Sequence, residues 1–306
     1  MKRDFLSILD LSREEIVKIF ELASELKEKS REGKCPQLLS GRSMALIFHK
    51  PSLRTRVSFE VGLNQLGGRG LYVTEQEIQL GIRESIHDVA KVLSRLVDGI
   101  MIRTFSHQDV EELAKWAEVP VINGLTDLLH PCQILSDLFT IQEKKGKVNG
   151  IKIAYLGDGN NVANSWLNAS ARIKLDLRIG TARGCEPDRE IFNQAKSSTV
   201  SKVTLTYEPK EAVRGADVIY TDVWASMGQK KRLAEKAELL KEFQVNNELL
   251  SYAHPDSLVM HCLPAERGRE ITDEVIDGPH SVVFDQAENR LHAQKALLVK
   301  LLVKSP

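Results

Sequence analysis

The sequence predicts an α/β protein of two domains, each a mainly parallel sheet flanked by helices. Short apolar runs alternate with longer amphipathic segments along the chain, and such strand–helix alternation favours parallel sheets. A length of 306 residues is typical of about two domains. The stretch "EKKGKVNG" at 143–150 is polar and contains glycine, which marks a boundary between two alternating halves. We therefore expect the first domain to cover residues 1–147 and the second to begin at residue 148.

The first half of the chain begins with a helix. Ser12 and Glu15 form a capping-box pattern, and apolar side chains follow at helical spacing. The segment 131–144 predicts another helix, because a proline stands in its first turn. Apolar runs predict strands at 43–48, 70–74, 99–104 and 119–123, and the segments between them predict helices near 52–66, 85–97 and 108–117.

The second half repeats this alternation and ends in a helix. Apolar runs predict strands at 151–156, 175–181, 202–206, 218–223, 257–262 and 281–285. The final stretch with helical apolar periodicity, about 288–303, predicts a terminal helix.

Composition argues against several classes of partner. The chain carries 42 Lys plus Arg and 42 Asp plus Glu, so it has no bulk positive charge with which to hold nucleic acid. No apolar run approaches the roughly 20 residues of a membrane span, and the N-terminal segment lacks the pattern of a signal peptide. The cysteines are widely spaced and form no CxxC pair, standing at Cys35, Cys132, Cys185 and Cys262. We therefore expect a cytoplasmic protein with reduced thiols, no bound metal, and no membrane or nucleic-acid partner.

A polar turn follows the first predicted strand. Ser52 can cap the next helix, so Arg54 and Thr55 lie on its first turn, where the helix dipole attracts anions. Arg54 adds a planar donor fork that suits phosphate. The apolar positions of this helix that we expect to face inward are Val57, Val61 and Leu66. The turn therefore indicates an anion site, and a capped surface helix with solvated arginines is the alternative.

Other strand ends carry weaker signals, although ligands of open α/β sheets bind at the carboxyl ends of strands. His130 begins "HPCQ" before a helix, and Arg103 closes the strand "GIMIR". Each of these two residues alone is more often structural than catalytic. The segment "GDGNNVA" at 157–163 superficially resembles a dinucleotide-binding fingerprint, but its third glycine is absent and the next strand does not end in an acid. A nicotinamide cofactor is therefore the weaker alternative.

Five segments taken together resemble one known family. They are "SLRTR", "HPCQ", "DVWASMG", "HCLP" and "AENRLHAQKALL", and the resemblance to the transcarbamoylases covers essentially the whole chain. In that family "SxRTR" and "HPxQ" mark carbamoyl phosphate binding, while "DxxxSMG" with "HCLP" marks the ornithine carbamoyltransferase branch. An aspartate-specific relative would be expected to carry "HPLP" and to lack "SMG". The resemblance implies a carbamoyl phosphate-binding first domain to which the C-terminal helix, 288–306, returns, an ornithine-binding domain at 148–287, and a homotrimer that can assemble further.

The resemblance also implies the residues of the site. Those for carbamoyl phosphate are Ser52, Leu53, Arg54, Thr55, Gln79, Arg103, His130, Gln133, Cys262, Leu263 and Arg290. Those for ornithine are Asn161, Asp222, Ser226 and Met227. Gln79 is expected to serve the site of a neighbouring subunit, and Arg56 is expected to form a structural ion pair. Arg83 departs from the residue that relatives often carry, so its contribution stays open.

The implied reaction is direct attack of the ornithine δ-amine on the carbamoyl carbon. It gives L-citrulline and phosphate without a cofactor or a covalent enzyme intermediate. The residues expected to act on the reacting groups are Arg54, Thr55, Arg103, His130, Asp222 and Cys262. The alternatives are a transcarbamoylase for another amine such as putrescine, a non-catalytic anion binder, and a nicotinamide-dependent oxidoreductase. The direction of flux, anabolic or catabolic, stays open.

Overall fold

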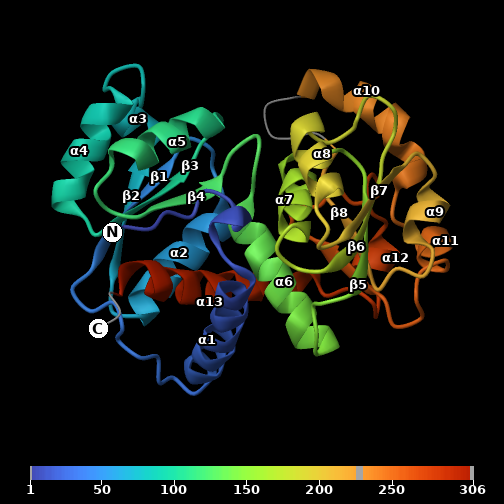
Figure 1. Cartoon of the computed structure of the whole chain (residues 1–306), viewed down its shortest axis with the longest axis horizontal. Coiled ribbons are helices and arrows are strands. Elements are labelled where there is room, and N and C mark those ends of the chain that lie inside the picture. The colour runs from blue at the N-terminus through green and yellow to red at the C-terminus, as the bar shows by residue number, and fades with distance from the viewer. Residues whose placement is uncertain (1, 225–229, 304–306) are drawn as a thin grey trace. The chain divides into compact units, whose positions relative to one another are not determined.

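The computed structural model describes residues 2–224 and 230–303, except for the side chains of residues 230–233. The chain forms two compact units, one made of Met1–Phe139 with Glu288–Pro306 and the other of Thr140–Ala287 (Figure 1). Each unit contains a parallel sheet with helices packed around it, so the predicted α/β class is confirmed. Within the described ranges, no helix has an apolar stretch long enough to cross a bilayer.

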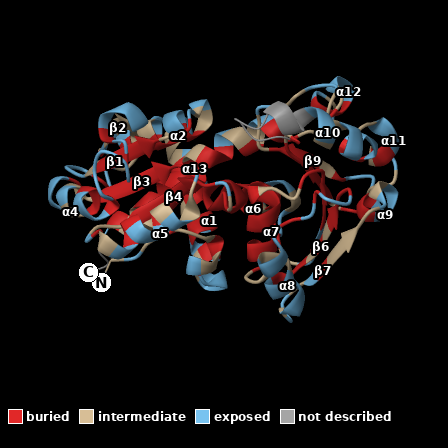
Figure 2. Cartoon of the chain, turned by 90° about the horizontal axis from the view of Figure 1, so that it is seen from above, coloured by how far each residue is buried: buried red, intermediate tan, exposed pale blue. Residues whose placement is uncertain are grey.

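The first unit is built on a four-stranded sheet in the order β2-β1-β3-β4. Its strands are β1 (Ser43–Phe48), β2 (Arg69–Thr74), β3 (Gly99–Arg103) and β4 (Val121–Leu125). All five residues of the central strand β3 are buried, as expected for a parallel strand covered on both faces, and so are those of the edge strand β4 (Figure 2). The predicted strand at 119–123 begins two residues later than expected, after Pro120.

The helices of the first unit begin within one residue of the predicted ranges, except for one short helix, α3, that was not predicted. They are α1 (Arg13–Arg31), α2 (Leu53–Gln65), α3 (Glu75–Ile78), α4 (Ile86–Leu96), α5 (His107–Trp116) and α6 (Pro131–Lys145). A 3₁₀ turn at Ile8–Asp10 precedes α1. The predicted capping box of α1 is confirmed, because the Ser12 side chain accepts from Glu15 N while the Glu15 side chain accepts from Ser12 N.

The inward face of α2 differs from the prediction. Val57 and Val61 are 46% and 38% exposed, so the expectation that they face inward is wrong, whereas Leu66 is fully buried as predicted. The buried face is set by contact with the C-terminal helix, which approaches α2 at Gly62. A Cβ atom at Gly62 would lie 3.2 Å from Lys295 Cγ, so glycine allows this close approach.

The second unit is built on a five-stranded parallel sheet in the order β7-β6-β5-β8-β9. Its strands are β5 (Ile151–Leu156), β6 (Leu175–Gly180), β7 (Lys202–Thr206), β8 (Val218–Thr221) and β9 (Leu258–His261). Its helices are α7 (Asn161–Ser170), α8 (Arg189–Ser197), α9 (Pro209–Val213), α10 (Lys230–Leu240), α11 (Asn247–Leu250) and α12 (Asp273–Ile276), with a 3₁₀ turn at Lys241–Phe243. The strand order reverses at β5 in this sheet and at β1 in the first, which predicts ligand crevices at the carboxyl ends of these strands.

The predicted strand at 281–285 is wrong. Ser281 forms only an isolated bridge with Val259, and helix α13 (Val283–Leu302) begins two residues later. The apolar run there is too short for periodicity to distinguish a strand from the start of a helix. Helix α13 therefore starts five residues before the predicted 288, and its part from Glu288 onward packs in the first unit.

Candidate active site

The polar turn after β1 is the N-terminus of α2. Ser52 is its N-cap, with an extended backbone and a side-chain oxygen that accepts the N–H of Thr55 at 3.2 Å. Thr55 is fully buried, Arg54 is half-buried, and the Leu53 side chain is 74% exposed. The positive end of the helix dipole therefore lies at the carboxyl end of a central strand, beside the hydroxyl of Thr55.

Two arginines from distant parts of the chain converge on the hydroxyl of Thr55. Arg290 on α13 donates from Nη2 to Thr55 Oγ1 at 2.9 Å and from Nη1 to Gln133 Oε1 at 2.9 Å. Arg103 at the end of β3 lies 3.5 Å from the same hydroxyl through Nη1. The Gln133 amide nitrogen donates in turn to buried Asp137 Oδ1 at 2.8 Å, which orients the glutamine oxygen toward Arg290. The cluster concentrates positive charge in a buried region of one unit.

His130 lies within the field of the same cations. It is 5% exposed, and burial holds the pKa of its imidazole well below the ordinary value of about 6.5. The positive charges of Arg290, Arg103 and Arg54 lower that pKa further. The imidazole is therefore neutral at physiological pH, and it offers one N–H donor beside a cationic cluster.

Three other residues of the first unit lie outside this cluster. Arg56 pairs with Glu60 at 3.1 Å on α2 and stacks over Tyr72 at 3.8 Å from the ring centroid, so the predicted ion pair is confirmed. Gln79 is exposed at the C-terminal end of α3 with a left-handed backbone (φ +48°). Arg83 is also exposed, and its Nη1 lies 3.5 Å from a backbone carbonyl of α3.

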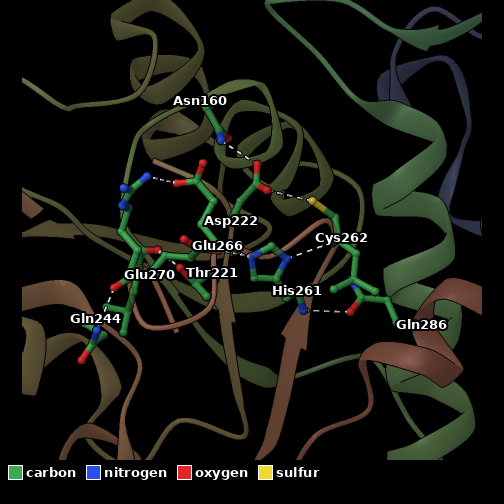
Figure 3. A network of polar contacts seen from close by, with 12 residues as sticks. Asn160, Thr221, Asp222, Gln244, His261, Cys262, Glu266, Glu270 and Gln286 are labelled. Carbon is green, nitrogen blue, oxygen red and sulfur yellow. Dashed lines mark hydrogen bonds and ion pairs between the residues drawn. The ribbon is translucent and has the colours of Figure 1, made fainter. Parts of the chain in front are cut away.

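In the second unit, polar side chains surround Asp222, which follows β8. Asp222 is 6% exposed, and both of its carboxylate oxygens have a hydrogen-bond donor (Figure 3). Asn160 Nδ2 donates to Oδ2 at 2.7 Å, and Cys262 Sγ donates to Oδ1 at 2.9 Å. The ends of β5, β8 and β9 thus bring together three side chains that are far apart in sequence.

The structure describes some of the other predicted residues of the second unit, of which Asn161, Ser226 and Met227 were expected to contact ornithine and Leu263 to contact carbamoyl phosphate. Asn161 is the first residue of α7 and is 8% exposed. Ser226 and Met227 lie outside the described residues. Leu263 adopts a left-handed backbone (φ +57°), and its N–H donates to His261 Nδ1 at 2.9 Å.

His261, Cys262 and Asp222 place one potential ligand atom each within 4.8 Å of one another, which raises the question of a metal site. Both ring nitrogens of His261 are already hydrogen-bonded, because Nδ1 accepts from Leu263 N and Nε2 lies 3.0 Å from Glu270 Oε1. A neutral imidazole with its proton on Nε2 satisfies both contacts. The side chain therefore orients the turn after β9, and the absence of a bound metal stays a prediction.

The glycines of "GDGNN" have a packing role. A Cβ atom at Gly159 would lie 2.1 Å from Pro187 N, and one at Gly157 would lie 3.0 Å from Trp224 Nε1. Both positions thus need glycine because the chain packs closely there. Close packing within the chain therefore accounts for both glycines without a bound dinucleotide.

Asn160 was not among the residues predicted for the site, whereas its neighbour Asn161 was. The signal for Asn160 was its place directly after the glycine turn and before α7, where asparagine is a favoured N-cap. Its contact with Asp222 could not be read from sequence, because the two residues lie 62 positions apart.

Comparisons with known proteins cover nearly the whole chain. A family model described as the carbamoyl-P binding domain of aspartate/ornithine carbamoyltransferase matches residues 3–143, and its Asp/Orn binding domain matches residues 149–301. The ornithine carbamoyltransferase of Carboxydothermus hydrogenoformans is 55% identical over 303 residues, which are 98% of this chain and 97% of that protein.

Solved structures agree with these matches. The ornithine carbamoyltransferase from Pyrococcus furiosus superposes with a TM-score of 0.95 at 50% identity, covering 100% of this chain and 98% of that one. The enzyme from Thermus thermophilus superposes with a TM-score of 0.88 at 42% identity, covering 99% of both chains. Both halves of the chain, with the buried cationic cluster in one and the Asp222 network in the other, therefore place this protein in the aspartate/ornithine carbamoyltransferase family.

Proposed function

We propose that this protein is an ornithine carbamoyltransferase, which transfers the carbamoyl group of carbamoyl phosphate to the δ-amine of L-ornithine. The observation that carries the proposal is the convergence of Arg103 and Arg290 on Thr55 at the N-terminus of α2, beside a neutral, buried His130. Such a cluster suits a dianionic phosphate joined to a neutral carbonyl. The relatives named ornithine carbamoyltransferase, at 50–55% identity over the whole chain, support the same activity.

Carbamoyl phosphate is assigned to residues 1–147 together with 288–306. The α2 turn, through Ser52, the Leu53 backbone, Arg54 and Thr55, would hold the phosphate by charge-assisted hydrogen bonds. Arg103 would span the phosphate and the carbonyl oxygen, Gln133 and His130 would reach the carbamoyl group, and Arg290 would close the cluster from α13.

The chemical step builds negative charge on the carbamoyl oxygen. The amine nitrogen forms a bond to the carbonyl carbon, the bond from that carbon to the phosphate oxygen breaks, and the amine loses a proton. Thr55, Arg103 and His130 are the proposed donors to the developing oxyanion. A neutral His130 would donate one hydrogen bond to the oxyanion and keep its own proton. The departing phosphate would be the final acceptor of the proton that the amine loses.

Ornithine is assigned to residues 148–287. Asp222 would pair with the α-ammonium, and Asn161 would donate its amide N–H to the carboxylate. Asp222 and Cys262 would also steer the amine and help to accept its proton. The assignment extends to Ser226 and Met227 as further contacts, whereas Leu263, like Cys262, belongs to the residues proposed for carbamoyl phosphate.

A homotrimer with shared sites is part of the proposal. Leu53, Val57 and Val61 lie at four-residue spacing along α2 and are 74%, 46% and 38% exposed, which makes an apolar stripe on its outer surface. Exposed apolar surface of this kind is typical of a subunit interface. Gln79, exposed at the end of α3, would then reach the site of the neighbouring subunit.

The test of the activity is citrulline formation from carbamoyl phosphate with ornithine, putrescine and aspartate supplied separately. We expect turnover with ornithine and at most a small fraction of that rate with the other two. Faster turnover of putrescine would reassign the substrate. Binding of carbamoyl phosphate without turnover of any amine would favour the non-catalytic alternative.

A further inference from the structure

The amide of Asn160 has a fixed orientation. Its Oδ1 accepts the backbone N–H of Val162 at 2.9 Å and that of Ala163 at 3.3 Å, as the N-cap of α7. The hydroxyl of buried Tyr155 lies 3.0 Å from the same oxygen. Backbone N–H groups only donate, so the end of the amide that faces them must be the oxygen.

Capping explains the oxygen of this side chain but not its nitrogen. Serine and aspartate cap helices about as well as asparagine does, and neither carries an N–H donor at that position. Because the oxygen is held by the helix, the Nδ2 group is turned toward Asp222 Oδ2, 2.7 Å away (Figure 3). All ten residues of α7 are buried, so the helix is a rigid base for this donor.

The second oxygen of Asp222 meets a different partner. Cys262 Sγ donates to Oδ1 at 2.9 Å, so Asn160 and Cys262 hold the carboxylate from its two sides. A thiol is a weak hydrogen-bond donor, whereas an amide N–H to a carboxylate makes a charge-assisted bond. The contact with Asn160 is thus the stronger of the two restraints on the carboxylate.

We propose that Asn160 is a positioning residue for ornithine. It holds Asp222 in the rotamer in which the carboxylate receives the ammonium of the substrate, and it acts through Asp222 rather than on the reacting atoms. This inference rests on the proposed function, and it adds a residue that defines how the amino acid is recognised. A substrate without an ammonium group opposite Asp222 would gain nothing from this contact.

Two substitutions at position 160 separate capping from positioning. Asn160→Ser keeps a capping oxygen and removes the donor to Asp222. Asn160→Asp keeps the cap and places a second carboxylate oxygen against Asp222 Oδ2. We expect the KM for ornithine to rise on the order of ten-fold in Asn160→Ser, as for loss of a hydrogen bond to a charged group, with kcat falling as well. The affinity for a phosphonate analogue of carbamoyl phosphate should stay within about two-fold.

The pH dependence distinguishes the two variants. Two facing carboxylates can share one proton, but they repel each other once both are ionised. The activity of Asn160→Asp relative to the parent protein should therefore fall as the pH rises from 6 to 9, whereas the relative activity of Asn160→Ser should stay level. Tyr155, Asp158 and Cys262 also face Asp222, and Lys236 pairs with Asp158 at 2.6 Å. These groups are unchanged in both variants and cancel in the ratio.

The matched control is Asn246→Asp. Asn246 is the N-cap of α11, with Oδ1 accepting from Leu249 N at 3.0 Å, and it lies outside the Asp222 network. We expect this variant to keep the parent kinetics at every pH. Melting temperatures of all variants report the cost of the cap change itself.

Calorimetry with L-norvaline, which has the ornithine backbone without the δ-amine, supplies a readout besides activity. With the phosphonate analogue present, Asn160→Ser should bind norvaline about ten-fold more weakly than the parent protein does. Parent-like KM and norvaline affinity in a folded Asn160→Ser would overturn the inference, as would equal, pH-independent losses in both variants that follow their melting temperatures. An inactive parent protein would instead reject the proposed function.

Discussion

At the residue scale, the hydroxyl of Thr55 is the point on which the first site is centred. Arg290 and Arg103 approach it from α13 and β3 at 2.9 and 3.5 Å, and His130 stays neutral in their field. Guanidinium groups at such close range repel one another, so a dianionic ligand would relieve an unfavourable arrangement as it binds. We therefore expect the cluster to bind a dianionic phosphate more tightly than a singly charged anion.

Truncation of Arg54 or Arg103 tests this centre. Arg54→Ala and Arg103→Ala should remain folded and lose turnover by on the order of 10²–10³-fold or more, because each removes a positive group that we propose to face the substrate phosphate or oxyanion. Steady-state rates and circular dichroism of the purified variants are the measurements. Near-normal turnover in a folded variant would remove that arginine from the site.

Asp222 provides the matching test for the amino acid. Asp222→Asn keeps the shape of the side chain and removes its charge, so the KM for ornithine should rise by at least about ten-fold and kcat should fall. Binding of the phosphonate analogue should barely change, because most of the residues proposed for it lie in the other unit. Unaltered ornithine kinetics, or an early loss of phosphonate binding, would show that Asp222 has a different role.

At the scale of elements, helices α1 and α13 each bury a lysine, a residue type that is rarely buried. Lys295 is fully buried and donates to Gln65 Oε1 at 2.9 Å and to a carbonyl of α1 at 3.2 Å. Lys27 is 3% exposed and donates to Asn289 Oδ1 at 2.7 Å. His292 lies on the same face of α13, and Glu288, which is half-exposed, is 3.6 Å from its Nε2. Protonation of His292 would add another cation to this packing.

This arrangement predicts a loss of stability in acid. Burial first, then the charges of Lys295, Lys27 and Arg31, lower the pKa of His292 to about 3. An unfolded histidine has a pKa of about 6.5, so between these values the unfolded chain binds a proton that the folded chain does not. The free energy of unfolding therefore decreases as the pH falls below 6.5, and it is fully retained above that value.

The variant His292→Gln isolates this contribution. His49, His107 and His130 also have lowered pKa values and stay in both proteins, so the difference between the two proteins reports His292 alone. Between pH 7 and pH 5 the parent protein should lose about 2 kcal/mol more of its unfolding free energy than the variant. Urea denaturation at the two pH values measures this, and parallel losses would reject the assigned pKa.

At the scale of the whole molecule, the proposed trimer makes a prediction about mixed assemblies. If Gln79 serves a neighbour, a site is intact where a subunit with a sound Arg54 meets a neighbour with a sound Gln79. Mixing Gln79→Ala with Arg54→Ala subunits, after dissociation and reassembly, should then restore activity in about one site in four. Rates before and after mixing, with light scattering to confirm the trimer, are the measurements.

The control is a mixture of Arg54→Ala with Arg103→Ala. Both arginines belong to the cationic cluster of one unit, so every subunit in this mixture carries a lesion in its own site and no recovery is expected. Recovery of activity in both mixtures would mean that the recovery does not depend on a site shared between subunits. No recovery in the first mixture, with mixed trimers present, would mean that Gln79 acts in its own subunit or in neither site.

Local sequence determined most of the elements of this protein. Strands such as β1 and β5 follow from apolar runs, and α1 follows from its capping box, because each of these signals lies within one strand or one helical turn. The parallel class follows from the alternation of such strands with helices. The anion-binding character of the α2 turn was also readable, since a cap, a helix start and an arginine fall within three residues. The full list of site residues came from the family resemblance rather than from spacing.

Tertiary structure alone decided which faces and polar ends are used. Val57 and Val61 had the spacing of a buried face, but α13 packs against Gly62 and turns them outward. The start of α13 at Val283 was hidden because a run of three apolar residues fits a strand as well as a helix. Asn160 was passed over because its partner, Asp222, is brought to it by the order of strands in a sheet. In each case the outcome depends on contacts between segments that are distant in sequence. Local periodicity carries no information about such contacts.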